Sequence, residues 1–113
     1  MIGNGLFITG TDTGVGKTWV TTRLIQKLRA TGVDAVGMKP VECGGREDSR
    51  AIFEASGGTA AGLTLEMVNP VSLPEPLAPA AAAIPHHIDF GEIRSAYETL
   101  ANRHEFVFIE GAG

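Results

Sequence analysis

A glycine-rich segment ending in lysine and threonine carries the clearest chemical signal. Residues 10–18 read GTDTGVGKT and lie between an apolar run at 6–9 and a helix-like pattern at 17–29. Glycines let backbone N–H groups surround an anion, and a helix N-terminus adds unpaired donors and a positive dipole end. There the Lys17 ammonium would contact terminal phosphates and the Thr18 hydroxyl would bind Mg²⁺. The segment therefore predicts a nucleotide-phosphate site.

The spacing of this loop is a variant. Five residues separate Gly10 from Gly16, so Thr11 stands where the usual phosphate loop has its first glycine. A dinucleotide-binding fingerprint fails because Trp19 occupies its third glycine position. A glycine-rich turn capped by a helix is the alternative without a ligand. We expect the Trp19 side chain to pack behind the loop.

One further lysine and two acids are candidates for the same chemistry. Lys39 follows an apolar run at 35–38 and could stabilise transferred charge, although most single lysines are solvated. Asp48 begins a helical pattern, and Glu110 ends the last apolar run. Mg²⁺ prefers hard oxygen ligands, and an acid after a strand holds the metal in phosphate-loop enzymes. The alternatives are a helix N-cap for Asp48 and a loop-ordering carboxylate for Glu110.

The pattern of apolar residues predicts an α/β fold that would bring these groups together. Strands are expected at 6–9, 35–38 and 106–109, and helices at 17–29, 48–55 and 89–102. Strands that alternate with helices indicate a parallel sheet flanked by helices. Ligands bind beyond the carboxyl ends of such strands, where segments 10–18, 39–48 and 110–113 would meet.

Several local features complete this prediction. Gly32 would end the first helix, and residues 40–47 are expected to be a loop. Five prolines between 67 and 85 favour an ordered loop or broken turns over a central strand, with one helical turn at 80–83. Asp89 would cap the last helix. The apolar helix positions expected to pack are Val20, Leu24, Ile25 and Leu28 in the first helix and Phe90, Ile93, Tyr97 and Leu100 in the last. The histidines at 86–87 are expected at a loop surface.

Composition narrows the class of protein. The 113 residues are 43% hydrophobic with a net charge of −4, which excludes a disordered or collagen-like chain. Mild acidity argues against nucleic acid or an anionic membrane as main partner. A single cysteine, no signal-peptide pattern and no long apolar stretch predict a cytoplasmic protein that spans no membrane. We expect residues 1–113 to be one domain, the N-terminal part of a longer chain.

Five segments together resemble the dethiobiotin synthetase family in order and spacing. They are GTDTGVGKT at 10–18, KPVECG at 39–44, NP at 69–70, PLAP at 76–79 and IEGAG at 109–113. The resemblance implies a P-loop NTPase-like fold of three layers, similar to a Rossmann fold, in a homodimer. It implies an ATP- and Mg²⁺-dependent ligase that converts 7,8-diaminononanoate and carbon dioxide into dethiobiotin, ADP and phosphate. The substrate carbamate would attack the γ-phosphate, and the resulting carbamic–phosphoric anhydride would close to a cyclic urea.

The resemblance also implies roles for particular residues. Lys17 and Lys39 match the lysines that steady the reacting charge. Thr18, Asp48 and Glu110 match the metal ligands, and Thr13 and Cys43 match substrate positions, although the family usually has a hydroxyl residue at Cys43. The nucleotide-binding residues would be Gly14, Val15, Gly16, Lys17, Thr18, Trp19, Asp48, Glu110, Gly111, Ala112 and Gly113. Two alternatives stay open: a switch-type P-loop ATPase, which would carry lysine in place of Asp12, and a non-catalytic domain of this fold.

Overall fold

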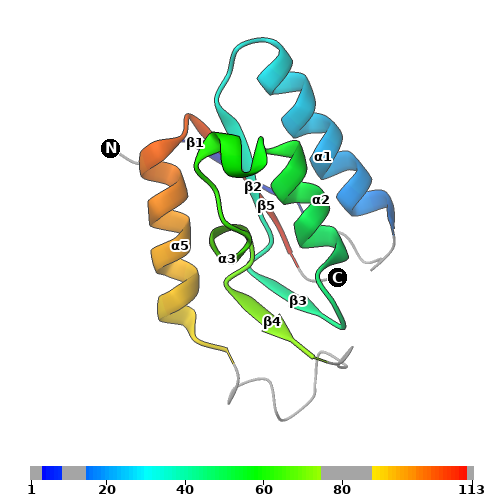
Figure 1. Ribbon diagram of the computed structural model, residues 1–113, viewed down its shortest axis with the longest axis vertical. Helices are drawn as coiled ribbons and strands as arrows, with labels where there is room; N and C mark the ends of the chain where they lie inside the picture. Colours follow the sequence, from blue (N-terminus) through cyan, green and yellow to red (C-terminus); the bar gives the residue numbers. More distant parts are fainter. Residues whose placement is uncertain (1–3, 9–14, 75–87, 112–113) are drawn as a thin grey trace.

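A computed structural model describes residues 4–8, 15–74 and 88–111 of the chain. At its centre is a three-stranded parallel sheet in the order β1-β5-β2 (Figure 1). The strands are β1 (Asn4–Ile8), β2 (Ala35–Met38) and β5 (Phe106–Glu110). Glu110 pairs with Ile8 in register, and Met38 pairs with Ile109 on the other side of β5. The carboxyl ends of all three strands therefore lie at one edge, as predicted.

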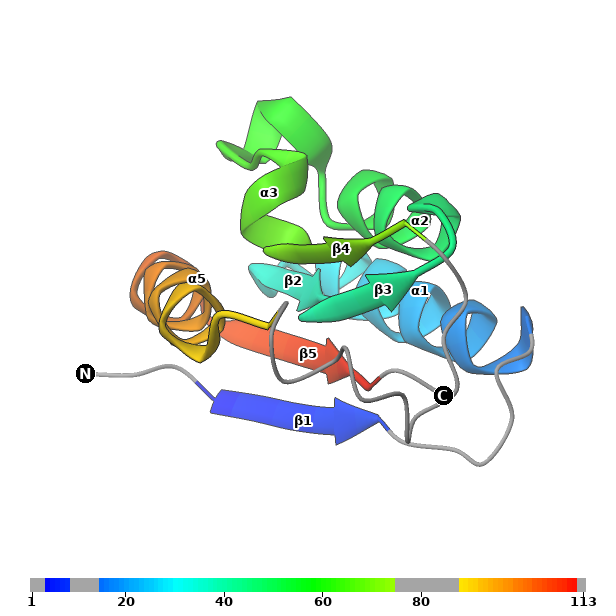
Figure 2. The same cartoon turned by 90° about the horizontal axis from the view of Figure 1, so that it is seen from below.

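Helices cover both faces of this sheet. Helices α1 (Val15–Ala30) and α2 (Glu47–Ala55) lie on one face, and α5 (Phe90–Arg103) lies on the other (Figures 1 and 2). All four residues of β2 are buried, because helices that cover both faces of a parallel sheet shield the side chains on both faces from solvent. This arrangement confirms the predicted three-layer α/β fold.

Close packing of α1 and α2 against β2 depends on Gly37. A Cβ atom there would lie 2.5 Å from Cγ2 of Ile52 and 2.6 Å from Cδ1 of Ile25. Ser56 Oγ also accepts a hydrogen bond of 2.8 Å from the Gly37 amide. The glycine therefore lets both helices approach the strand that leads to Lys39.

The predicted helix ends are largely confirmed. Gly32 follows α1 with a φ of 93°, a left-handed conformation that glycine adopts without strain. Asp89 caps α5, and its Oδ1 accepts hydrogen bonds from the Gly91 amide at 2.9 Å and the Glu92 amide at 3.2 Å. The start of α2 differs from the prediction, because the helix begins at Glu47 and residue 46 makes no side-chain cap.

The segments expected to be loops contain regular structure. Residues 41–43 form β3 (Val41–Cys43), which pairs in parallel with β4 (Val71–Leu73) in a separate two-stranded sheet. This sheet lies beyond β2, away from β1 (Figure 2). A 3₁₀ turn, η1 (Gly58–Ala61), and α3 (Leu65–Val68) precede β4. Pro70 and Pro74 flank β4 and do not interrupt it. A strand of three residues therefore fits between these two prolines.

Part of the predicted core is wrong. The Trp19 side chain is 57% exposed, and the Arg23 guanidinium lies 5.0 Å from its ring centroid, so it does not pack behind the loop. Phe90 is 71% exposed in the first turn of α5. The exposed side chains on α1 include Val20 and Leu24. The rest of both faces is confirmed: Ile25 and Leu100 are buried, and Leu28, Ile93 and Tyr97 pack against the core.

The predictions for residues 80–83 and 86–87 lie outside the described residues, as do Thr9 and most of the phosphate loop. Within the described ranges, no helix has the length and apolar character needed to cross a membrane.

Candidate active site

A buried ammonium group is at the centre of the predicted site. Lys39 directly follows β2 and is 5% exposed. Its Nζ donates hydrogen bonds to Glu110 Oε2 at 2.8 Å and to Asp48 Oδ2 at 3.2 Å. Burial lowers the pKa of Lys39, but the hydrogen bonds and negative charges of Glu110 and Asp48 outweigh it, so the pKa lies above its ordinary value. Lys39 is therefore a fixed positive charge at neutral pH.

Glu110, at the end of β5, binds groups from two other elements. Its side chain is fully buried, and Oε2 accepts a hydrogen bond of 2.8 Å from Thr18 Oγ1 as well as the Lys39 contact. Its Oε1 accepts a hydrogen bond of 2.7 Å from Thr21 Oγ1. Thr21 was not predicted from the sequence, although residues three apart share a helix face and Thr18 was already a candidate.

Among the described residues, the ammonium of Lys17 is buried and has no hydrogen-bond partner. Its Nζ has almost no solvent contact and forms no hydrogen bond within the described part of the chain. An ammonium carries three donors, and burying it unpaired is costly. This atom is therefore suited to an anionic ligand at the start of α1, which is where the sequence predicts phosphates.

Asp48 lies in the first turn of α2, but the reading of it as an N-cap is wrong. The cap position is Arg46, whose side chain makes no capping bond. The first turn is held instead by Glu42 of β3, which accepts hydrogen bonds from the Asp48 amide at 3.1 Å and the Ser49 amide at 2.9 Å. The Asp48 carboxylate is thereby left to contact Lys39.

A buried asparagine holds the backbone of Lys39. Asn69 Nδ2 donates to the Lys39 carbonyl at 2.8 Å and to the Val71 carbonyl at 2.9 Å. Arg46 donates to Asn69 Oδ1 at 2.9 Å and to the Asn69 carbonyl at 2.8 Å. The start of α2 and the end of β2 are thus connected through the side chains of Arg46 and Asn69, for which the sequence predicted no role.

The oxygen atoms at the site are compatible with Mg²⁺. Glu110 and Asp48 converge on one cation, the Lys39 ammonium, and the Thr18 hydroxyl reaches the same Glu110 oxygen. Mg²⁺ is usually held by one or two carboxylates together with water and phosphate oxygens, so this hard-oxygen set suits it. No group of three or more His, Cys, Asp or Glu side chains gathers within residues 4–8, 15–74 and 88–111.

Other predicted residues are less closely tied to this cluster. Cys43 ends β3 as a free, half-buried thiol, and the Trp19 side chain faces solvent. Gly16 lies in the first turn of α1, and the Gly111 amide donates to the Ile8 carbonyl at 3.1 Å. The backbone of Val15 begins α1. Thr13, Gly14, Ala112 and Gly113 lie outside the described residues.

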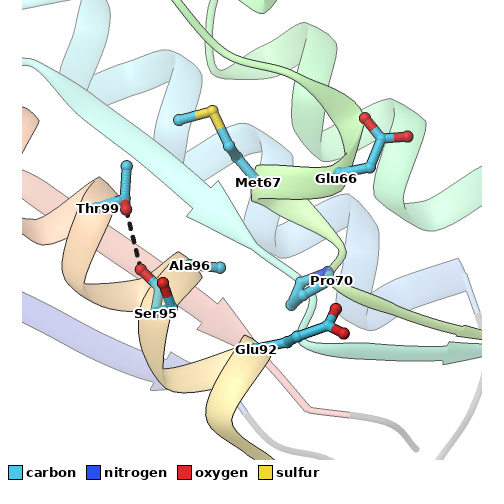
Figure 3. A pocket seen from close by; sticks show the side chains of 7 residues that line it. All are labelled: Glu66, Met67, Pro70, Glu92, Ser95, Ala96 and Thr99. Carbon is cyan, nitrogen blue, oxygen red and sulfur yellow. Dashed lines mark hydrogen bonds between the residues drawn. The ribbon is translucent and has the colours of Figure 1, made fainter. Parts of the chain in front are cut away.

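A surface groove between α3 and α5 is separate from this cluster. It has a volume of about 290 Å³, and none of its lining residues is a predicted site residue (Figure 3). The lining residues are Glu66, Met67, Pro70, Glu92, Ser95, Ala96 and Thr99. The groove therefore has no lining residue in common with the cluster of Lys39, Asp48 and Glu110.

Comparison with curated proteins supports the resemblance seen in the sequence. The chain is 46% identical to the ATP-dependent dethiobiotin synthetase of Anaeromyxobacter dehalogenans (strain 2CP-C), over 96% of this chain and 50% of that protein. It is 43% identical to the same enzyme of Akkermansia muciniphila, over 94% of this chain and 49% of that protein. It is 40% identical to the same enzyme of Methanocaldococcus jannaschii, over 96% of this chain and 52% of that protein. The chain thus spans about half the length of the curated relatives it matches.

A family model described as an AAA domain matches residues 4–113. This match covers every described element, from β1 to the end of β5. It agrees with the parallel sheet, the helices on both faces, and the lysine and threonine at the start of α1. The chain therefore belongs to this AAA domain family of P-loop NTPases.

Proposed function

We propose that this chain is the N-terminal half of an ATP-dependent dethiobiotin synthetase. The enzyme would use ATP and Mg²⁺ to convert 7,8-diaminononanoate and carbon dioxide into dethiobiotin. The observation that carries the proposal is the buried Lys39 ammonium, held by Glu110 and Asp48 at the edge of the sheet. The identity to curated dethiobiotin synthetases supports the substrate assignment.

In this proposal the start of α1 binds the nucleotide phosphates. The Lys17 ammonium, which has no hydrogen-bond partner among the described residues, would contact them, and backbone amides from Gly14 to Trp19 would add further donors. Thr18, Asp48 and Glu110 would hold Mg²⁺, which when bound neutralises phosphate charge and aligns the phosphates. Gly111, Ala112 and Gly113 would border the nucleotide after β5.

Lys39 would act as a fixed positive charge and not as a base. Its raised pKa keeps the ammonium protonated at neutral pH, so it cannot accept a proton from the substrate amine. It would stabilise negative charge on the carbamate and on the transferred phosphoryl group. Phosphoryl transfer depends on positioning and charge neutralisation more than on a protein nucleophile. The charged groups of this site would supply that positioning and neutralisation.

The finer parts of the assignment belong to the same proposal. Thr13 and Cys43 would contact the diamine substrate, and the enzyme would be a cytoplasmic homodimer. A cysteine thiol is a weaker hydrogen-bond partner than a hydroxyl, so we expect Cys43→Ser to lower the KM for the diamine.

The test is an assay of dethiobiotin formation by the 113-residue chain and by the full-length protein. We expect the full-length protein to hydrolyse ATP only when diaminononanoate and bicarbonate are both present. Lys39→Ala should abolish turnover while ATP affinity changes by only a few-fold. Rapid hydrolysis without substrate would instead favour a switch-type ATPase. Nucleotide binding without turnover in the full-length protein would favour a non-catalytic domain.

A further inference from the structure

Glu42 is a buried carboxylate to which the proposed reaction gives no role. It lies in the middle of β3 and is 7% exposed. Within the described residues it forms no ion pair with a lysine, arginine or histidine. Its hydrogen-bond donors in the described part of the chain all come from the first turn of α2: the Asp48 amide, the Ser49 amide and the Ser49 hydroxyl.

These contacts replace the missing cap of α2. The first amides of a helix lack partners within the helix, and the positive end of the dipole favours a negative charge there. Side-chain capping by the residue at position 46 is absent, so the carboxylate of a neighbouring strand satisfies two of those amides. A buried charge without a basic partner is stable in this place because donors surround it.

The same contacts determine where Asp48 points. Glu42 binds the amide of Asp48 itself and that of the next residue, so it anchors the backbone from which this carboxylate projects. The Asp48 side chain then reaches Lys39 Nζ at 3.2 Å. Anchoring the backbone on one side leaves the carboxylate free to face the cation on the other.

We propose that Glu42 is a positioning residue that holds Asp48 in place to contact Lys39 and, on the function proposed above, to bind Mg²⁺ together with ATP. It touches neither metal nor substrate and acts through the first turn of α2. Groups that orient metal ligands change metal affinity by about 10–100-fold when they are replaced. A cap with no positioning role would change only the stability of the fold.

Glu42→Gln tests this proposal, with Glu47→Gln as the matched control. Both variants remove one negative charge near the start of α2, but Glu47 is exposed and makes no side-chain hydrogen bond within the described residues. Calorimetry with Mg²⁺ and a non-hydrolysable ATP analogue should give a Kd raised by about tenfold for Glu42→Gln. The kcat at saturating Mg²⁺ should remain within about twofold of the wild-type value, because no reacting group is lost. Glu47→Gln should resemble the wild type in both measurements.

A ligand-free measurement separates this inference from the proposed function. In ¹⁵N NMR spectra, the Lys39 ammonium and the Asp48 amide should shift in Glu42→Gln and stay in place in Glu47→Gln. Unchanged signals would overturn the positioning role, whatever the activity. If Glu42→Gln had an unchanged affinity for Mg²⁺·ATP and a lower melting temperature, Glu42 would only cap α2, and the positioning role would be refuted. Failure of the wild type to bind Mg²⁺·ATP would instead refute the proposed function and leave the NMR result to decide the inference.

If Glu42→Gln does not fold, Ser49→Ala provides a milder change. It removes one donor to Glu42 and keeps both amide bonds. We expect a smaller rise in the Kd for Mg²⁺·ATP and a smaller shift of the Lys39 signal. No change in either quantity would overturn the proposal.

Discussion

Replacement of Lys39 by methionine should cost the fold several kcal/mol. Methionine has a similar length, so the change removes the charge with little loss of volume. The wild-type Nζ lies 2.8 Å from a fully buried Glu110 carboxylate, whose remaining donors among the described residues would be the hydroxyls of Thr18 and Thr21. Removing one partner of a buried ion pair leaves an uncompensated charge and costs about 3–5 kcal/mol.

A double-mutant cycle with Glu110→Gln separates the ion pair from other effects. The single Glu110→Gln change should cost less than Lys39→Met, because Lys39 keeps its contact with the half-buried Asp48. The double variant has neither buried charge, so its loss should be smaller than the sum of the two single losses. Contacting residues in one network couple by about 0.5–3 kcal/mol, and we expect the upper part of that range.

Urea denaturation followed by circular dichroism gives the four free energies of unfolding. Equal m-values across the cycle would show that the variants unfold from comparable structures. Single losses that add to within about 0.5 kcal/mol would mean that the two groups do not interact. A Lys39→Met loss below about 1 kcal/mol, the range of exposed ion pairs, would likewise contradict a buried ammonium.

Three further perturbations test other parts of the structure. The pKa of Lys39 is raised, so the ammonium stabilises the fold relative to Lys39→Met. This stabilisation is complete below the ordinary lysine pKa of about 10.4. It is lost only as the pH rises through the higher pKa of the folded state. Denaturation at pH 7, 8 and 9 should therefore give the same difference between the two proteins, and a decline within that window would argue against the raised pKa. Gly37→Ala should lower the free energy of unfolding by about 1–3 kcal/mol, since its Cβ would lie 2.5 Å from Ile52 Cγ2, and a neutral result in thermal melts would show that α2 can move away from β2. Asn69→Ala should cost at least about 2 kcal/mol in urea titrations, because it leaves the buried Lys39 carbonyl without its amide donor, and a loss under 1 kcal/mol would indicate that water replaces the side chain.

Long elements with a clear apolar period were predictable from the sequence. The strand before Lys39 and the helix capped by Asp89 are found with nearly the expected bounds, because burial and capping are local in sequence. The small sheet was missed because its strands have three residues each and are bordered by prolines. A pattern of period two cannot be recognised in so short a segment, and the partner strand lies nearly thirty residues away.

Side chains that act through distant contacts were harder to predict. Thr21 and Glu110 are 89 residues apart in the sequence, and Asn69 reaches Lys39 across 30 residues. No local motif links such pairs, so only the fold brings them together. Trp19 was misplaced for a related reason, because apolar character alone does not tell which face of a helix meets the sheet.

The two predicted catalytic lysines are in different electrostatic situations. Lys39 is balanced by Glu110 and Asp48, so its charge is already compensated before any ligand binds. The Lys17 ammonium has no partner within the described residues, so its positive charge is available to attract an anionic ligand. Under the proposed function, Glu110 and Asp48 would bind both Lys39 and Mg²⁺. The Lys39 charge would then be less fully compensated by these acids and could stabilise the phosphoryl group. Lys17 would then contribute mainly to binding, and Lys39 mainly to the reaction that follows.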